Sequence, residues 1–464
     1  MTQPVFEAEL LFDGNIWHRN YRFQVNLKGN IEIPPPTTDI KIKSLGIVIP
    51  GFLNSHSHAF QRAMAGRGEL LGGSQLKDSF WTWRNQMYDL VHHIDENVLR
   101  SILRFLFMEM LESGYTSLGE FHYLHHPKTN LKKTTPVEES LRTARRLLAE
   151  SELIGIQLCL LPVLYENSGF DQPALEKQRP FLTGSLTSFY ELIHQLQMDC
   201  PATSKIGIAL HSLRAVGENS LLNCLEHFQN QDLPRHIHIA EQPAEVEECL
   251  RSRGQRPVSY LMDRTTIDES WTLIHATHLS AVERRSLAQS KASVCLCPIT
   301  EANLGDGIFP LVEFLEEGGQ ICIGSDSNIH LDPFEELRWL EYSQRYRYLK
   351  RACVSNPDEP SPGTVLARQA YRTGQKSLDL PVGFLRSGHQ ANFVVLRQDH
   401  PATIRKQTQT LWDEILFSSS KEIIDEVYVG GVRQVSQGQH RSRKSCFEDY
   451  SEAILELEDR KSRG

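Results

Sequence analysis

The sequence predicts an α/β protein built on a closed (β/α)8 barrel of the TIM type, with a small β-sandwich-like unit formed by both ends of the chain. Eight short apolar runs can be read as strands, and most are separated by segments whose apolar residues recur at helical spacing. Strands that alternate with helices favour a parallel sheet, and eight such units over about 330 residues favour a closed barrel. The two ends of the chain alternate instead like short antiparallel strands.

The expected barrel strands are short and spread along the chain. They span residues 46–53, 116–121, 154–161, 205–210, 236–240, 271–275, 293–297 and 320–325. The clearest helix between them runs from Glu96 to Ser113, where Asp95 can cap the N-terminus and Gly114 can end the helix. Further helices are expected over 138–150, 186–198, 244–253, 281–289 and 334–350, and a loop over 355–363.

Both ends of the chain are expected to pair with each other outside the barrel. The alternating stretches are residues 21–27, 391–396 and 424–431. We therefore expect a small β domain of residues 1–50 and 385–440, a barrel domain of residues 51–384, and a charged tail of residues 441–464. Within the tail, a loosely docked helix is expected over 448–457.

Composition and charge argue against several classes of protein. With 464 residues, 40% of them hydrophobic, the chain can bury a large core. A formal net charge of −9, with no long basic run outside the tail, argues against a nucleic-acid partner. No run of about 18 apolar residues predicts a membrane helix, and the N-terminus lacks the pattern of a signal peptide. Nine scattered cysteines are typical of reduced thiols, so we expect a cytoplasmic protein with no membrane partner.

Residues of the kinds that bind metals follow several of the expected strands. His56 and His58 follow the first strand, His238 the fifth, His275 the sixth and Asp326 the eighth. The C-terminal ends of barrel strands meet on one face, where barrel enzymes carry their chemistry. Imidazole and carboxylate ligands suit a zinc-type ion that keeps one position for water, and such an ion lowers the pKa of that water to about 7.

Other polar residues near these strands have more than one interpretation. Glu241, three residues after His238, is either an exposed loop carboxylate or a proton shuttle beside the activated water. Four further histidines lie in polar stretches and are expected to be solvated: His92, His93, His125 and His126.

The order His-x-His, His-x-x-Glu, His and Asp resembles that of the amidohydrolase superfamily, in its deaminase branch. This resemblance implies a barrel flanked by a β unit from both termini. A lysine at the end of the fourth strand would imply a member with two metals. Here that strand ends in Leu210-His211-Ser212 and Lys205 lies at its start, so we expect one divalent metal per chain. The expected metal is zinc, and iron stays open as the alternative.

Several local motifs are similar to those of the formimidoylglutamate deiminases, a family of histidine degradation. The motifs are His56-Ser57-His58-Ala59-Phe60-Gln61-Arg62, Trp81-Thr82-Trp83-Arg84, Glu120-Phe121-His122-Tyr123, His211-Ser212-Leu213-Arg214 and Thr300-Glu301-Ala302-Asn303-Leu304-Gly305-Asp306-Gly307. The similarity extends from about residue 45 to 350, and more loosely through both ends. It implies that zinc is held by His56, His58, His238 and Asp326. It also implies catalytic roles for Glu241, His275 and Asp326, and substrate contacts from Gln61, Arg84, Tyr123, His211 and Arg214.

The expected substrate is a small dicarboxylate, N-formimidoyl-L-glutamate, which would be hydrolysed to N-formyl-L-glutamate and ammonia. Arg84 and Arg214 offer planar guanidinium groups that match carboxylates, although each arginine can equally form a structural ion pair. Two other functions stay open: a deaminase of a guanine-like or adenosine-like substrate, and a barrel without catalytic activity. We also expect a homodimer.

Overall fold

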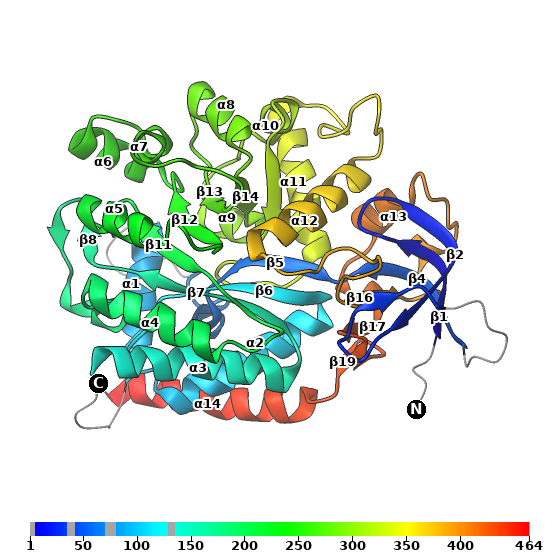
Figure 1. Ribbon diagram of the computed structural model, residues 1–464, viewed down its shortest axis with the longest axis horizontal. Helices are drawn as coiled ribbons and strands as arrows, with labels where there is room; N and C mark the ends of the chain where they lie inside the picture. Colours follow the sequence, from blue (N-terminus) through cyan, green and yellow to red (C-terminus); the bar gives the residue numbers. More distant parts are fainter. Residues whose placement is uncertain (1–4, 35–41, 70–79, 129–134, 464) are drawn as a thin grey trace.

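The computed structural model describes residues 5–34, 42–69, 80–128 and 135–463 (Figure 1). It contains a parallel barrel sheet surrounded by helices, and a second sheet built from both ends of the chain that lies beside it. The predicted fold class is therefore confirmed. Within the described residues, no helix combines the length and the apolar character needed to cross a membrane.

All eight barrel strands run parallel, in the order of the chain. They are β5 (Phe52–Ser57), β6 (Tyr115–His122), β7 (Gln157–Leu164), β11 (Ile208–Ser212), β12 (Arg235–Ile239), β13 (Trp271–His275), β14 (Ser293–Leu296) and β15 (Gln320–Ile323), with the short β10 (Lys205–Ile206) paired to β7. The barrel closes between β5 and the end of β15. There the backbone N–H of Asp326 donates to the carbonyl of His56 at 3.0 Å, and the N–H of His58 donates to the carbonyl of Asp326 at 2.9 Å.

The helices that follow these strands include all six that the sequence predicts. In chain order they are α1 (Phe80–Val91), α2 (Glu96–Glu112), α3 (Pro136–Ile154), α4 (Leu186–Asp199), α5 (Glu218–His227), α6 (Pro243–Arg253), α7 (Pro257–Arg264), α8 (Ala281–Ser290), α9 (Pro298–Leu304), α10 (Leu311–Glu316), α11 (Pro333–Tyr348), α12 (Pro362–Leu378), α13 (Leu411–Ser418) and α14 (Arg443–Arg463). Asp95 caps α2 as predicted, because its side chain accepts from Asn97 N and Val98 N, each at 3.0 Å. The predicted loop over 355–363 lies between α11 and α12, and its last two residues belong to α12.

The prediction of one strand over residues 46–53 was wrong. This run divides into β4 (Ile42–Pro50), which belongs to the terminal sheet, and β5, which opens the barrel. Gly51 lies between the two strands, and a Cβ there would stand 2.2 Å from Thr116 Cγ2. The second half of β4 and all of β5 are buried, so the hydrophobic pattern does not show where the chain passes from the terminal sheet into the barrel. His56 consequently lies inside a strand rather than after one.

The terminal sheet pairs the two ends of the chain, as predicted. It contains β1 (Val5–Phe12), β2 (Trp17–Val25), β3 (Ile31–Glu32), β4, β16 (Phe393–Leu396), β17 (Ile424–Val429), β18 (Val432–Ser436) and β19 (Gln439–His440). Neighbouring strands are antiparallel except β1 and β4, which are parallel. The sheet encloses its own aromatic cluster, in which Phe6 stacks on Phe23 at 5.2 Å and Phe393 stacks on Tyr428 at 4.3 Å.

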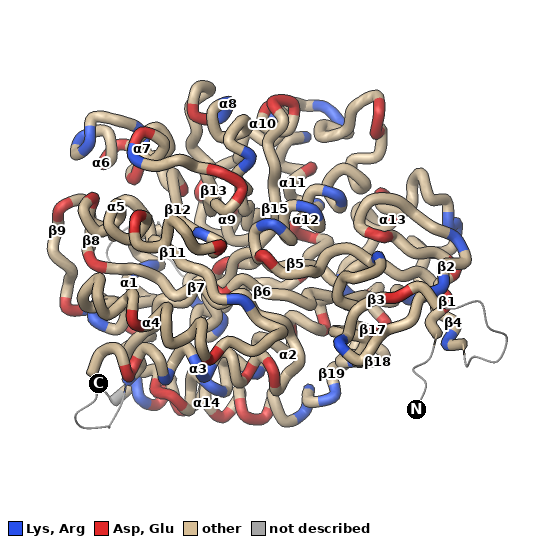
Figure 2. Tube along the Cα trace, in the orientation of Figure 1, with Lys and Arg blue, Asp and Glu red and all other residues tan. Residues whose placement is uncertain are grey.

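The C-terminal helix is longer and more firmly docked than the sequence predicts. α14 lies along α2 at the edge of the barrel (Figure 1), and it carries charges of both signs along its length (Figure 2). The Tyr450 ring stacks on Phe105 of α2 with centroids 4.1 Å apart, and Leu457 is fully buried. The buried residues of α14 recur at helical spacing, but the many charges between them mask this pattern in the sequence.

Replacement of Leu457 by alanine tests this docking. Because Leu457 is fully buried, we expect Leu457→Ala to lower the free energy of unfolding by about 2–5 kcal/mol. Leu455, on the same helix but 71% exposed, is the matched control, and Leu455→Ala should change stability by no more than about 0.5 kcal/mol. Urea denaturation of both variants measures the difference. Equal losses in the two variants would contradict the docked position of α14.

Candidate metal centre and pocket

Four of the predicted ligands meet at the C-terminal end of the barrel. Asp326 Oδ1 lies 3.2 Å from the Nε2 atoms of both His56 and His58. His238 Nε2 lies 3.1 Å from His56 Nε2 and 3.3 Å from His58 Nε2. All four side chains are buried. His275 stands beside them, and one ligand atom from each of His56, His238, His275 and Asp326 falls within 4.8 Å of the others.

The tautomers of two of these histidines leave bare nitrogens facing each other. Nδ1 of His58 lies 3.1 Å from the carbonyl of Phe121, and Nδ1 of His238 lies 3.1 Å from the carbonyl of His211. A carbonyl oxygen only accepts, so each Nδ1 carries the proton and each Nε2 presents a lone pair. Two lone pairs 3.3 Å apart repel unless a cation lies between them. The ligand edges of a tetrahedral zinc site are about 3.3–3.4 Å, given Zn–N bonds of 2.0–2.1 Å. The donor set therefore fits a zinc-type ion.

Burial keeps the ligands in the protonation state that a metal requires. It lowers the pKa of His56 to about 3 and holds the pKa of His238 well below its ordinary value, so both rings are neutral near pH 7. Burial alone would raise the pKa of Asp326, but the adjacent imidazoles of His56 and His58 hold it well below the usual range. Neutral imidazole and ionised carboxylate are the metal-binding forms.

Strained backbone at the strand ends is held by buried hydrogen bonds. Asp326 and Ala240 adopt positive φ angles of 44° and 52°, which L-residues rarely take. The side-chain amide of Asn328 donates to the carbonyls of Asp326 and His58, both at 3.1 Å. Glu245 accepts from the backbone N–H groups of Ala240 and Glu241 at 3.0 and 3.1 Å. The surrounding structure thus fixes the direction of the ligands before any metal binds.

Glu241 and His275 lie next to the ligand cluster. Nε2 of His275 is 3.9 Å from Glu241 Oε1 and 3.8 Å from Asp326 Oδ2. Glu241 is 8% exposed and lines the pocket, so it is not a freely exposed loop carboxylate. Burial raises the pKa of Glu241. Burial alone would lower the pKa of His275, but the carboxylates of Glu241, Glu301 and Asp326 raise it well above its ordinary value.

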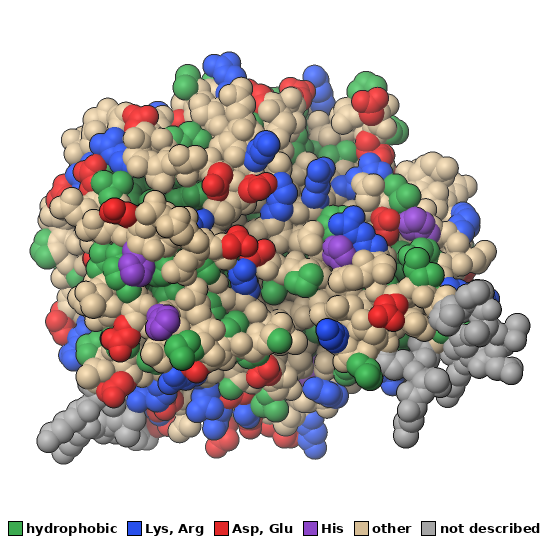
Figure 3. Space-filling view, viewed as in Figure 1, with side chains coloured by type: hydrophobic (Ala, Val, Ile, Leu, Met, Phe, Trp, Pro, Cys, Tyr) green, Lys and Arg blue, Asp and Glu red, His purple; other side chains and the backbone are tan. Residues whose placement is uncertain are grey.

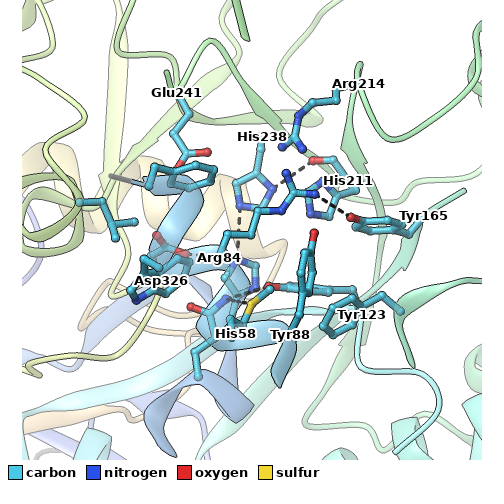
Figure 4. Close-up of a pocket in the computed structure, with 16 residues that line it drawn as sticks. His58, Arg84, Tyr88, Tyr123, Tyr165, His211, Arg214, His238, Glu241 and Asp326 are labelled. Atoms are coloured by element: carbon cyan, nitrogen blue, oxygen red, sulfur yellow. Dashed lines mark hydrogen bonds and ion pairs between the residues drawn. The ribbon is translucent and has the colours of Figure 1, made fainter. Parts of the chain in front are cut away.

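A narrow cavity of about 50 Å³ adjoins this cluster (Figure 4). The five predicted substrate contacts all line it: Gln61, Arg84, Tyr123, His211 and Arg214. The structure adds lining residues that were not predicted as substrate contacts, namely Phe80, Trp83, Met87, Tyr88, Tyr165, Phe181 and Leu304. Four of these follow the helical spacing of α1, which also carries Arg84, and that spacing is the signal that could have identified them.

The two arginines of the pocket have no carboxylate partner among the described residues. Buried Arg214 has no hydrogen-bond partner for Nε or Nη1, and Arg84 donates to the Tyr165 hydroxyl at 3.2 Å. Both guanidinium groups lie over the Trp81 ring, at 5.4 and 5.6 Å from its centroid. Burial and the nearby charge of Arg84 lower the pKa of Arg214. Among the described residues, neither arginine therefore forms the structural ion pair that was the alternative interpretation.

The opposite charges occupy opposite sides of the cavity. Figure 4 shows Glu241 and Asp326 on one side, and Arg214 with Tyr165 on the other. The cavity can therefore receive a molecule that is positively charged at one end and negatively charged at the other.

Two buried carboxylates near the site had no predicted role. Glu301 accepts from His275 Nδ1 at 3.1 Å, and Glu120 accepts from the backbone N–H of Ala59 at 2.7 Å, next to His58. Burial raises the pKa of Glu120 to about 8. Both residues belong to motifs noted in the sequence.

Two of the histidines that we expected to be solvated are not. His125 is buried, with Nε2 2.8 Å from the carbonyl of Val163. The side chain of His126 is 16% exposed, with Nδ1 3.0 Å from Glu139 Oε2 and Nε2 2.9 Å from the carbonyl of Leu182.

Comparisons with known proteins agree with this arrangement. The model of the amidohydrolase family matches residues 47–433. The chain is 41% identical over 463 residues to the formimidoylglutamate deiminase of Pseudomonas aeruginosa, a match that covers 99% of this chain and 100% of the relative. A crystal structure of an amidohydrolase from Brucella melitensis has a TM-score of 0.88 at 35% identity, covering 98% of this chain and 100% of that chain. An adenosine deaminase from Xanthomonas campestris with bound zinc has a TM-score of 0.79 at 17% identity, covering 100% and 99% of the two chains, which shows a shared fold alone.

Metal analysis tests the convergence of the four ligands. We expect one equivalent of a divalent metal per chain, because one set of ligand atoms converges at one point. Removal of the metal by a chelator should lower the thermal unfolding midpoint, and added zinc should restore it. His238→Asn should lose the metal, whereas the control His278→Asn, outside the cluster, should keep it. Two equivalents per chain, or a full equivalent in His238→Asn, would contradict the site.

Proposed function

The chain belongs to the amidohydrolase family, and we propose that it hydrolyses N-formimidoyl-L-glutamate to N-formyl-L-glutamate and ammonia. One observation carries this proposal. A cavity beside a metal-type ligand cluster contains two guanidinium groups without a carboxylate partner among the described residues. A buried unpaired charge is costly, so the cavity favours a ligand that supplies carboxylates.

The charge of this substrate matches the two sides of the cavity. Its glutamate part carries two carboxylates, which suit the planar donors of Arg84 and Arg214. Its formimidoyl group is an amidine, a strong base that is positively charged at neutral pH. That end suits the side of Glu241 and Asp326, and the buried Oε1 of Gln61, which has no partner, offers a further acceptor. A neutral purine would leave both guanidinium charges unpaired.

The metal proposed for this site is a single divalent ion, zinc, with iron as the alternative. His56, His58, His238 and Asp326 would hold it. The fourth barrel strand, β11, carries no lysine at its C-terminal end, and Lys205, in the short β10 before it, pairs with Asp379. A zinc-type ion supplies a water of lowered pKa, which serves as the nucleophile at neutral pH.

The residues around the ligands handle the protons of the reaction. The oxygen of water bonds to the formimidoyl carbon, and the bond from that carbon to the terminal nitrogen breaks. His275 and Asp326 orient the water and take up its proton, and Glu241 passes a proton to the departing nitrogen, which leaves as ammonia. Burial raises the pKa of Glu241, which favours its proton-carrying form. The protons belong to Glu241, His275 and Asp326 as a coupled group.

Two alternatives fit the site less well. A deaminase of an adenosine-like or guanine-like base has support from the aromatic residues Trp83, Tyr88 and Phe181, which line the cavity and could stack on a base. That substrate, however, gives Arg84 and Arg214 no partner. A barrel without catalytic activity does not require a complete set of ligands, nor Glu241 and His275 beside them.

Ammonia release from a small set of substrates tests the proposal. With zinc-loaded protein, we expect turnover of N-formimidoyl-L-glutamate and no comparable release from adenosine, guanine or cytosine. The reason is that only the first substrate pairs both guanidinium groups. A coupled ammonia assay at neutral pH measures the rates. Turnover of a nucleobase at a higher kcat/KM would favour the deaminase alternative, and no ammonia from any compound would favour the barrel without activity.

A further inference from the structure

Glu301, in the first turn of α9, lies behind His275 on the side away from the ligand cluster. Its Oε1 accepts from His275 Nδ1 at 3.1 Å and from the backbone N–H of Cys297 at 2.9 Å. Glu301 is 6% exposed and His275 is fully buried. Glu301 does not line the cavity. It can therefore act on the substrate only through His275.

The contact with Glu301 determines which nitrogen of His275 carries the proton. A carboxylate oxygen only accepts, so the 3.1 Å contact places the proton on Nδ1. In the neutral ring, which is the form that can take up the proton of water, Nε2 is then a bare acceptor, and it has no hydrogen-bond partner among the described residues. It faces Glu241 Oε1 at 3.9 Å and Asp326 Oδ2 at 3.8 Å, distances that leave space for a bridging water rather than a direct bond.

We propose that Glu301 is a positioning residue that fixes the tautomer and orientation of His275, and so the acceptor that His275 offers to the attacking water. This inference deepens the proposed function and rests on it. The Asp of a Ser-His-Asp triad acts on its histidine in the same way, and an amide in its place gives the wrong tautomer and a fall in kcat of about 10⁴-fold.

A simple helix cap is the competing interpretation. Glu138 of α3 and Glu283 of α8 also reach back from the first turn to the backbone N–H of the N-cap residue. Among the described residues, neither of these glutamates accepts a hydrogen bond from an imidazole, whereas the same Oε1 of Glu301 accepts from Cys297 and from His275. Capping alone accounts for the bond to Cys297 and leaves the bond to His275 unexplained.

The decisive variant is Glu301→Gln, which keeps the size of the side chain and an oxygen that can cap α9. Its amide group can donate to Nδ1, and a proton on Nε2 then becomes possible. We expect kcat for N-formimidoyl-L-glutamate to fall by roughly 10²-fold to 10⁴-fold. KM should change by less than about threefold, because Glu301 does not touch the substrate. Metal content should stay at the wild-type level. The control Glu138→Gln, which alters only a cap, should keep wild-type kcat.

The tautomer is read directly by ¹⁵N NMR of zinc-loaded protein with labelled histidine, without substrate. The His275 signals are those lost in His275→Asn. The ¹⁵N chemical shift of a protonated ring nitrogen differs clearly from that of a bare one. We expect the wild-type proton on Nδ1 and a population with the proton on Nε2 in Glu301→Gln. A wild-type proton on Nε2 would overturn the inference even if the variant does not fold.

Two further outcomes also overturn it: wild-type kcat in Glu301→Gln, or a fall in kcat while the proton stays on Nδ1. The NMR measurement needs no turnover. A result against the role of Glu301 can therefore be told apart from a result against the proposed function, which the ammonia-release test measures.

Discussion

Uncompensated polar groups at the C-terminal end of the barrel are the constraint on which the rest of the site depends. Nε2 lone pairs of His58 and His238 face each other at 3.3 Å, and the guanidinium group of Arg214 is buried with two nitrogens unpartnered. Each arrangement costs free energy in the isolated chain, typically several kcal/mol for a buried unpaired charge. In the function that we propose, both costs are relieved by ligands, a cation in one case and carboxylates in the other. The two requirements together define the chemistry of the molecule.

The fold holds these groups in place because the barrel closes at the ligands themselves. Backbone hydrogen bonds between His56 and Asp326 join the first and last strands. The same bonds that close the sheet therefore also position two of the ligands. Asn328 and Glu245 then fix the turns that follow the strands. The terminal sheet and α14 lie outside this region. The face in Figure 3 carries interspersed positive and negative side chains, in contrast to the segregated charges of the cavity.

The sequence predicted what depends on local pattern. Strand and helix periodicity placed His238, His275 and Asp326 at strand ends, and the structure brings them together. Periodicity could not separate β4 from β5, because both are buried where they meet. Whether Arg84 and Arg214 have ion-pair partners, and whether Glu301 contacts His275, depends on residues distant in the chain. Such tertiary contacts leave no periodic signal in one sequence.

The most direct test of the account is the affinity of two nearly isosteric ligands, N-formyl-L-glutamate and N-formyl-L-glutamine. They differ in one charge, the side-chain carboxylate. Calorimetric titration of the zinc-loaded protein should show tighter binding of the glutamate compound by about 2–5 kcal/mol, or roughly 30-fold to several thousand-fold. This preference should largely disappear in one of the two variants, Arg84→Met or Arg214→Met, and persist in the other and in the control Arg251→Met. Equal affinity of the wild-type protein for the two compounds would contradict the claim that the unpaired arginines bind substrate carboxylates.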